Sequence, residues 1–160
     1  PLTFDSDMQK WRLEICSDEV TARTYSRVQG QDSEGFAIDD SSRMVTVVWD
    51  RIKIMNGGLG DVVDVEEGGI VWFTAVYEFD DAVFDGSKGT LYVNGSPMTW
   101  NSEKQRWEIV FPYDMEGNTK TFRITSVHDN IYDLTAINDA VEEITVSWAR
   151  IEMDFESSPA

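Results

Sequence analysis

The chain opens with the phrase PLTFDSDMQKW, and residues 97–107 repeat it as PMTWNSEKQRW. Residues 1–18 align with 97–114 without a gap; the identical pairs include Pro1 with Pro97, Thr3 with Thr99, and Trp11 with Trp107. After a short insertion the offset becomes 99, and TVVWDRI at 46–52 matches TVSWARI at 145–151. A period near 100 residues is far longer than a solenoid repeat and is the usual length of an immunoglobulin-like β-sandwich.

The repeat predicts a domain organisation. Residues 1–50 form the back half of an immunoglobulin-like repeat that lacks its first strands, 51–152 form a complete domain, and 153–160 form a tail. Three explanations stay open: a fragment of a longer tandem array, a subunit completed by the strands of a neighbour, or a first half that packs on the complete domain. A half sandwich left alone exposes its core face and its strand edges.

The hydrophobic pattern predicts an all-β chain. GGIVWFTAVYEFD at 68–80 alternates with apolar residues on both faces, as a central strand does. Asn94-Gly95 is flanked by strand-like residues and predicts a two-residue hairpin turn. The stretch DLTAINDAVEE at 133–143 has room for a short turn of helix.

The net charge and the length of the apolar runs limit the kinds of partner that this chain can bind. The 160 residues have a net charge of −17, which repels nucleic acids and anionic membranes. No apolar run approaches the roughly 18 residues of a membrane span, so no membrane insertion is expected. The single cysteine, Cys16, has no disulfide partner within the chain and is expected to be a small buried residue.

Tryptophans are the candidate ligand residues. Trp11, Trp107, Trp49 and Trp148 occupy repeated strand positions and are expected in the core. Trp72 and Trp100 are less constrained and are candidate exposed aromatic residues for binding glycans.

The sequence contains no recognisable catalytic pattern, and we expect that the protein is not an enzyme. The single histidine, His128, lies in an apparent loop with no legible nucleophile beside it. Asp129, Asn130 and Asp133 are candidate ligands for a structural Ca²⁺, although their spacing matches no known calcium loop and such residues also build turns. Lys53 and Asn138, on the expected first strand and just before the last, are a candidate pair for an isopeptide cross-link.

Residues 71–111 and 121–148 resemble immunoglobulin-like repeats of large archaeal surface proteins. The resemblance implies an exported, multi-domain, non-enzymatic surface or filament protein. The function predicted is an extracellular structural or adhesive module that assembles by completing its half-domain with strands of a neighbouring copy. The alternative is a carbohydrate-binding module or an accessory domain of a secreted hydrolase.

Overall fold

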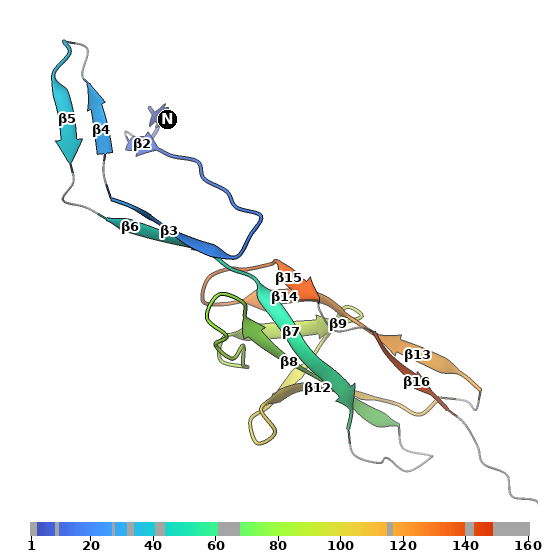
Figure 1. Cartoon of the computed structure of the whole chain (residues 1–160). Coiled ribbons are helices and arrows are strands. Elements are labelled where there is room, and N and C mark those ends of the chain that lie inside the picture. The colour runs from blue at the N-terminus through green and yellow to red at the C-terminus, as the bar shows by residue number, and fades with distance from the viewer. Residues whose placement is uncertain are drawn as a thin grey trace, which may run out of the picture.

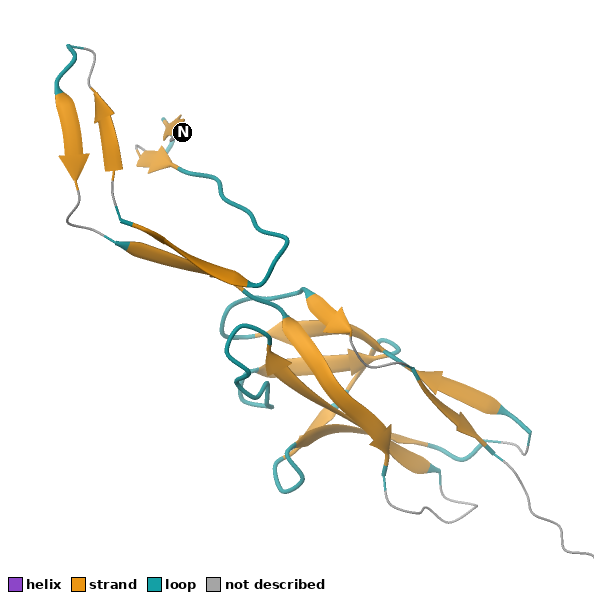
Figure 2. Cartoon of the chain, viewed as in Figure 1, coloured by secondary structure: helices purple, strands orange, loops and turns teal. Residues whose placement is uncertain are grey.

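A computed structural model describes residues 3–8, 10–26, 28–31, 34–40, 44–60, 68–114, 117–139 and 143–148. Within these ranges every regular element is a β-strand, and Figure 2 shows strands joined by loops. The all-β prediction is therefore confirmed. No helix of the described residues is long and apolar enough to cross a membrane.

Two facing sheets form the body of the molecule. The larger one has five strands in the order β11 (Thr99–Asn101), β12 (Arg106–Phe111), β8 (Gly69–Tyr77), β7 (Ile52–Leu59) and β15 (Ile137–Asp139). Its neighbours are antiparallel except for β15, which runs parallel to β7. The smaller sheet has the order β10 (Ser96–Pro97), β9 (Gly89–Val93) and β14 (Ile124–Asp129). A separate pair joins β13 (Thr119–Phe122) to β16 (Ile144–Ser147).

Strand β8 is central, as its sequence predicts. Its alternate residues Val71, Phe73, Ala75 and Tyr77 are buried, and the residues between them are half-buried. It lies between β12 and β7, so both of its edges are hydrogen-bonded. The period of two in its burial is that of a strand with one face on the core.

The core lies between the two sheets. Phe73 of β8, Trp107 of β12 and Phe84 meet Leu91 and Val93 of the smaller sheet in one buried cluster. Trp107 stacks on Phe84 at 5.9 Å between ring centroids, and its indole Nε1 donates to the carbonyl of Phe84 at 2.8 Å. The polar end of this large ring is thus satisfied inside the core.

Two glycines let aromatic side chains of β8 cross β7. Gly57 is the register partner of Phe73, and Gly58 is the partner of Trp72. A Cβ atom at Gly57 would lie 2.7 Å from the Phe73 ring, and one at Gly58 would lie 2.9 Å from the Trp72 ring. The Gly-Gly pair is therefore needed for the packing of the two rings.

Residues 3–49 form three separate two-stranded pairs that extend away from the two sheets, as Figure 1 shows. They are β1 (Thr3–Asp5) with β2 (Lys10–Arg12), β3 (Thr21–Tyr25) with β6 (Val45–Trp49), and β4 (Val28–Gln31) with β5 (Ala37–Asp40). These strands do not cover the body.

The hairpin prediction is confirmed, and the suggested helical turn is not. Asn94 and Gly95 both have positive φ, at 48° and 79°, and they join β9 to β10. Of the stretch at 133–143, residues 133–139 end in β15, a strand, and residues 140–142 lie outside the described part of the chain.

Candidate functional site

The N-terminal segment is residues 1–50, the front segment is 51–96, and the C-terminal segment is 97–148.

The first strand pair has the same register in the N-terminal and C-terminal segments. Phe4 pairs with Trp11 in β1–β2, and Trp100 pairs with Trp107 in β11–β12. These partners are related by the offset of 96 that the sequence shows.

The turn inside this pair is also repeated. Asp5 Oδ1 accepts the backbone N–H groups of Asp7 and Met8, each at 3.0 Å. Asn101 Oδ1 accepts those of Glu103 and Lys104, each at 3.1 Å. Both turns are therefore closed by an Asx side chain at the same repeat position.

A threonine pair marks the second repeated strand pair. Thr24 lies opposite Thr46 in β3–β6, with 2.9 Å between their hydroxyl oxygens. Thr121 lies opposite Thr145 in β13–β16, with 3.2 Å between theirs. The offset is 97 on the first strand and 99 on the second, so the extra residues fall between the two strands.

The strands that follow differ between the segments. In the C-terminal segment, β14 pairs with β9 and β15 pairs with β7, both of which belong to the front segment. In the N-terminal segment, the counterparts β4 and β5 pair with each other, with Val28 opposite Asp40. The repeated pairs are thus the ones that a segment makes within itself, and the changed pairs are the ones that need front strands.

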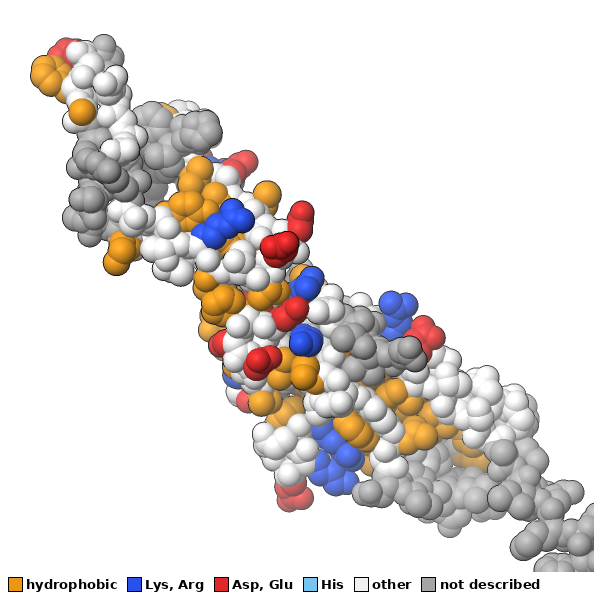
Figure 3. Space-filling view, in the orientation of Figure 1, with side chains coloured by type: hydrophobic (Ala, Val, Ile, Leu, Met, Phe, Trp, Pro, Cys, Tyr) orange, Lys and Arg blue, Asp and Glu red, His pale blue; other side chains and the backbone are white. Residues whose placement is uncertain are grey.

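Side chains at matching positions differ in burial. Phe122 is 3% exposed, whereas its counterpart Tyr25 is half-buried. Val45 is 59% exposed, whereas its counterpart Ile144 is half-buried. Figure 3 shows hydrophobic side chains on the surface of this part of the molecule. The N-terminal segment therefore presents apolar surface that its counterpart covers.

A polar cluster holds the junction between the N-terminal segment and the body. Asp50 Oδ1 accepts the backbone N–H of Phe79 at 2.9 Å. Arg51 contacts Glu78 with two nitrogens, Nε at 2.5 Å and Nη2 at 3.2 Å. Asn138 Nδ2 donates to Glu78 Oε2 at 3.0 Å. We call Asp50, Arg51, Glu78 and Asn138 the junction cluster.

The hydrogen bond from Arg51 is the largest cause that lowers the pKa of Glu78; burial opposes it, and the hydrogen bond from Asn138 adds to it. The same contact raises the pKa of Arg51. Sequence reasoning did not single out Asp50, Arg51 or Glu78. The signal for Arg51 was its repetition as Arg150 in the shared phrase.

Trp72 and Trp100 are half-buried and in contact with other side chains. Trp72 donates its Nε1 to the carbonyl of Leu59 at 2.9 Å, and the Arg106 guanidinium lies 5.0 Å from its ring centroid. Trp100 packs edge-on against Trp107 at 5.4 Å. The structure does not bring the two tryptophans into one described groove, and glycan binding by either stays a prediction.

The prediction that the repeated tryptophans lie in the core has a different outcome for each residue. Trp107 is 2% exposed, and Trp148 is half-buried against Phe111, with 5.8 Å between ring centroids. Trp49 is half-buried, and Arg23 lies 5.8 Å from its ring centroid. The side chain of Trp11 lies outside the described part of the structure.

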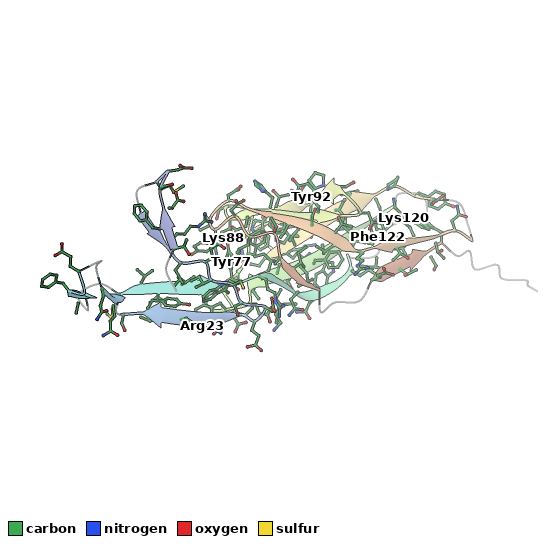
Figure 4. The ribbon with its side chains drawn as sticks, turned by 90° about the horizontal axis from the view of Figure 1, so that it is seen from above. Arg23, Tyr77, Lys88, Tyr92, Lys120 and Phe122 are labelled. Atoms are coloured by element: carbon green, nitrogen blue, oxygen red, sulfur yellow. The ribbon has the colours of Figure 1, made fainter. Side chains whose placement is uncertain are left out.

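Cationic side chains also lie over aromatic rings elsewhere in the molecule, as the labelled residues of Figure 4 allow the reader to follow. Lys88 lies 5.4 Å from the ring centroid of Tyr77, and Lys120 lies 5.3 Å from that of Phe122. Such contacts cover the edges of the apolar core with charge.

The three candidate calcium ligands lie in different surroundings. Asp129 is 2% exposed, and its carboxylate accepts from Tyr77 Oη and from the backbone N–H groups of Ile131 and Tyr132. Asn130 lies in the turn and Asp133 directly after it, and both are exposed. Among the described residues no three His, Cys, Asp or Glu side chains are grouped to hold a metal ion. Calcium binding stays a prediction.

Lys53 and Asn138 are brought together, because they are register partners in the parallel pair β7–β15. Register partners project from the same face of a sheet. The amide of Asn138 is hydrogen-bonded to Glu78, whose lowered pKa keeps it a carboxylate rather than a proton donor. The cross-link stays a prediction, and a mass about 17 Da below that of the sequence would reveal it.

Cys16 is exposed, so the expectation of a buried thiol is wrong. It lies beyond the end of β2, and its counterpart in the C-terminal segment, Pro112, is exposed as well. The position faces solvent in both segments. His128 is exposed, and it lies in strand β14 rather than in the expected loop.

Comparison with protein-family models, with curated proteins and with solved structures finds no match to this chain.

Proposed function

We propose that this chain is a non-enzymatic structural module of a tandem-repeat protein on the cell surface. The observation that supports the repeat most strongly is the matching register of β1–β2 with β11–β12, together with the Asx turn that both pairs contain. Register and turn contacts are set by local sequence, so their repetition indicates two copies of one structural unit.

We infer an immunoglobulin-like topology for residues 51–148. In that fold, strands A, B, E and D form one sheet, while C and F belong to the other. The order β11-β12-β8-β7 corresponds to D-E-B-A when β7 is taken as A, and β9 beside β14 corresponds to C beside F. The parallel β15 then adds a fifth strand beside β7, the strand taken as A.

The junction cluster supports a role as a stiff spacer. Only Asp50 and Arg51 separate β6 from β7, and both are hydrogen-bonded to residues of the loop after β8. A connection of two anchored residues gives consecutive repeats a fixed angle, in contrast to a flexible Gly/Ser linker. A rod of such repeats would hold a distal domain or ligand away from the cell.

Surface labelling tests the location and the role. Antibodies raised against the 160-residue chain should label intact cells that produce the protein, and external protease should remove the label. Labelling only after the cells are permeabilised would overturn an extracellular role. An antibody to a cytoplasmic protein of the same cells provides the control for leakage.

A further inference from the structure

We propose that the N-terminal segment is a docking surface for a second front segment, that is, for a three-stranded unit of the sequence type of residues 51–96. This inference rests on the proposed tandem-repeat function and names the partner that such a repeat requires.

The C-terminal segment shows what the docked state contains. Trp107 of β12 pairs with Phe73 of β8, Val127 of β14 pairs with Leu91 of β9, and β15 pairs with β7. Three strands of the front segment therefore each pair with a different strand of the C-terminal segment. The counterparts of those three recipient strands are β2, β4 and β5.

The pairing of β4 with β5 is the part that docking would change. Their counterparts Val127 and Asp139 lie in different sheets, on β14 and β15. A front segment must therefore separate β4 from β5 and take one into each sheet. The pairs β1–β2 and β3–β6 already have the docked register and need no rearrangement.

Matching apolar positions identify the surface that would be covered. Leu13 is 41% exposed and corresponds to half-buried Ile109, while Val45 and Tyr25 correspond to Ile144 and Phe122. In the C-terminal segment, Phe122 packs on Phe111 at 5.1 Å between ring centroids. The residue types needed for this packing are present in the N-terminal segment.

An intact second copy does not provide the occupant. In each copy, β8 lies between β12 and β7, β9 lies between β10 and β14, and β7 lies between β8 and β15. The edges that β2, β4 and β5 would need on these strands are already paired with β12, β14 and β15. The occupant is therefore an additional front segment rather than the one already folded onto residues 97–148.

The sequence supplies a natural way to add that unit. In the chain the front segment passes into the C-terminal segment at Ser96-Pro97, and Pro1 is the counterpart of Pro97. A protein that reads residues 51–96 followed directly by residues 1–160 recreates this connection without a linker.

Hydrogen exchange of this extended protein tests the docking. Backbone amides of β3 and β6 should exchange at least about tenfold more slowly than in the 160-residue chain and approach those of β13 and β16. Residues 97–129 serve as the internal standard, because they occur once in the extended protein and their exchange should not change. Unchanged exchange in β3 and β6 would overturn the proposal.

A matched variant distinguishes the effect of docking from the effect of merely adding residues to the chain. In the added unit alone, the positions of Phe73 and Leu91 are changed to Asp, which puts charges on its inward face. In this variant the backbone amides of β3 and β6 should exchange as fast as they do in the 160-residue chain. Equal protection with and without the charges would contradict docking through the apolar face.

A pair of alanine substitutions keeps the proposal testable if the extended protein folds only in part. Tyr25→Ala should lower the unfolding midpoint of the first repeat in the extended protein and leave the 160-residue chain unchanged. Phe122→Ala should lower the unfolding midpoint in both the extended protein and the 160-residue chain. An equal effect of Tyr25→Ala in both proteins would overturn the proposal. Surface labelling is independent of these measurements, so failure of docking and failure of the surface role are distinguishable.

Discussion

Asp129 closes the turn after β14 with both of its carboxylate oxygens. Oδ1 accepts from Tyr77 Oη and from the backbone N–H of Ile131, each at 3.0 Å, and Oδ2 accepts from Tyr132 N–H at 3.2 Å. Burial is the largest cause that raises the pKa of Tyr77, and the hydrogen bond to Asp129 adds to it. The phenol therefore stays protonated at neutral pH and donates its hydrogen bond to Asp129.

Removing this carboxylate should be costly. Asp129→Ala leaves the buried Tyr77 hydroxyl and two part-buried backbone N–H groups without their acceptor, and we expect it to lower the free energy of unfolding by about 2 kcal/mol. Tyr77→Phe removes a single donor and should cost less. Urea unfolding of both variants measures the difference. A larger loss for Tyr77→Phe than for Asp129→Ala would contradict the assigned role of the carboxylate.

Glu78 makes stability depend on pH. Its folded pKa is lowered by Arg51 from an ordinary value of 4.5, so the charged form is favoured by folding. The resulting stabilisation is complete above about pH 4.5 and is lost as the pH falls through the lower folded pKa. The stability difference between the native chain and Glu78→Gln should therefore shrink from pH 7 to pH 3. Chemical unfolding at both pH values measures it, and a constant difference would be the contrary result.

At the scale of elements, the β9–β10 hairpin depends on its turn. Asn94 Nδ2 donates to the carbonyl of Thr121 at 2.7 Å, and Asn94 Oδ1 accepts the N–H of Arg123 at 3.1 Å. The turn thus also ties the hairpin to β13 and to the residue before β14. Its sequence signal, Asn-Gly, is strong because both residues need positive φ.

Gly95→Ala should destabilise the fold by about 1 kcal/mol, because φ is 79° and an L-residue is strained there. A Cβ at Gly95 meets no atom within 4 Å, so the cost is that of the backbone alone. Gly68→Ala should cost more, since its Cβ would lie 2.1 Å from the carbonyl oxygen of Phe111. Thermal unfolding compares the two, and the reverse order would contradict this account.

At the scale of the whole molecule, apolar exposure and net charge oppose each other. The chain has a net charge of −17, which keeps copies apart at low salt. Exposed apolar side chains of the N-terminal segment, such as Val45 at 59%, favour association. Salt shortens the screening length from about 10 Å at 0.1 M to about 3 Å at 1 M.

The average mass of the 160-residue chain in light scattering should therefore rise with salt. Val45→Asp should weaken the rise, because it places a charge on the N-terminal segment. Val110→Asp is the matched control, since it adds the same charge at a position on the body that is 74% exposed. If both variants behave alike, or if the native chain stays monomeric at every salt concentration, association does not involve the N-terminal segment.

Much of the fold was predictable because its signals are local. The alternation along β8, the Asn94-Gly95 turn and the burial of Trp107 each follow from residues close in sequence. The parallel strand β15 was missed, because three residues carry too short a pattern to tell a strand from a turn. Among the candidate sites, Lys53 and Asn138 were named as a pair from the sequence, and the structure places them side by side as register partners.

The sequence by itself determined the all-β class, the internal repeat and the absence of any legible catalytic pattern, because composition and strand periodicity are properties of short stretches. Only the tertiary structure decided which strands pair across the chain and that Arg51, Glu78 and Asn138 meet at the junction. The hydrogen bonds of the junction join residues up to 60 positions apart. No local pattern encodes them, since they form only when several strands have taken their places in one sheet.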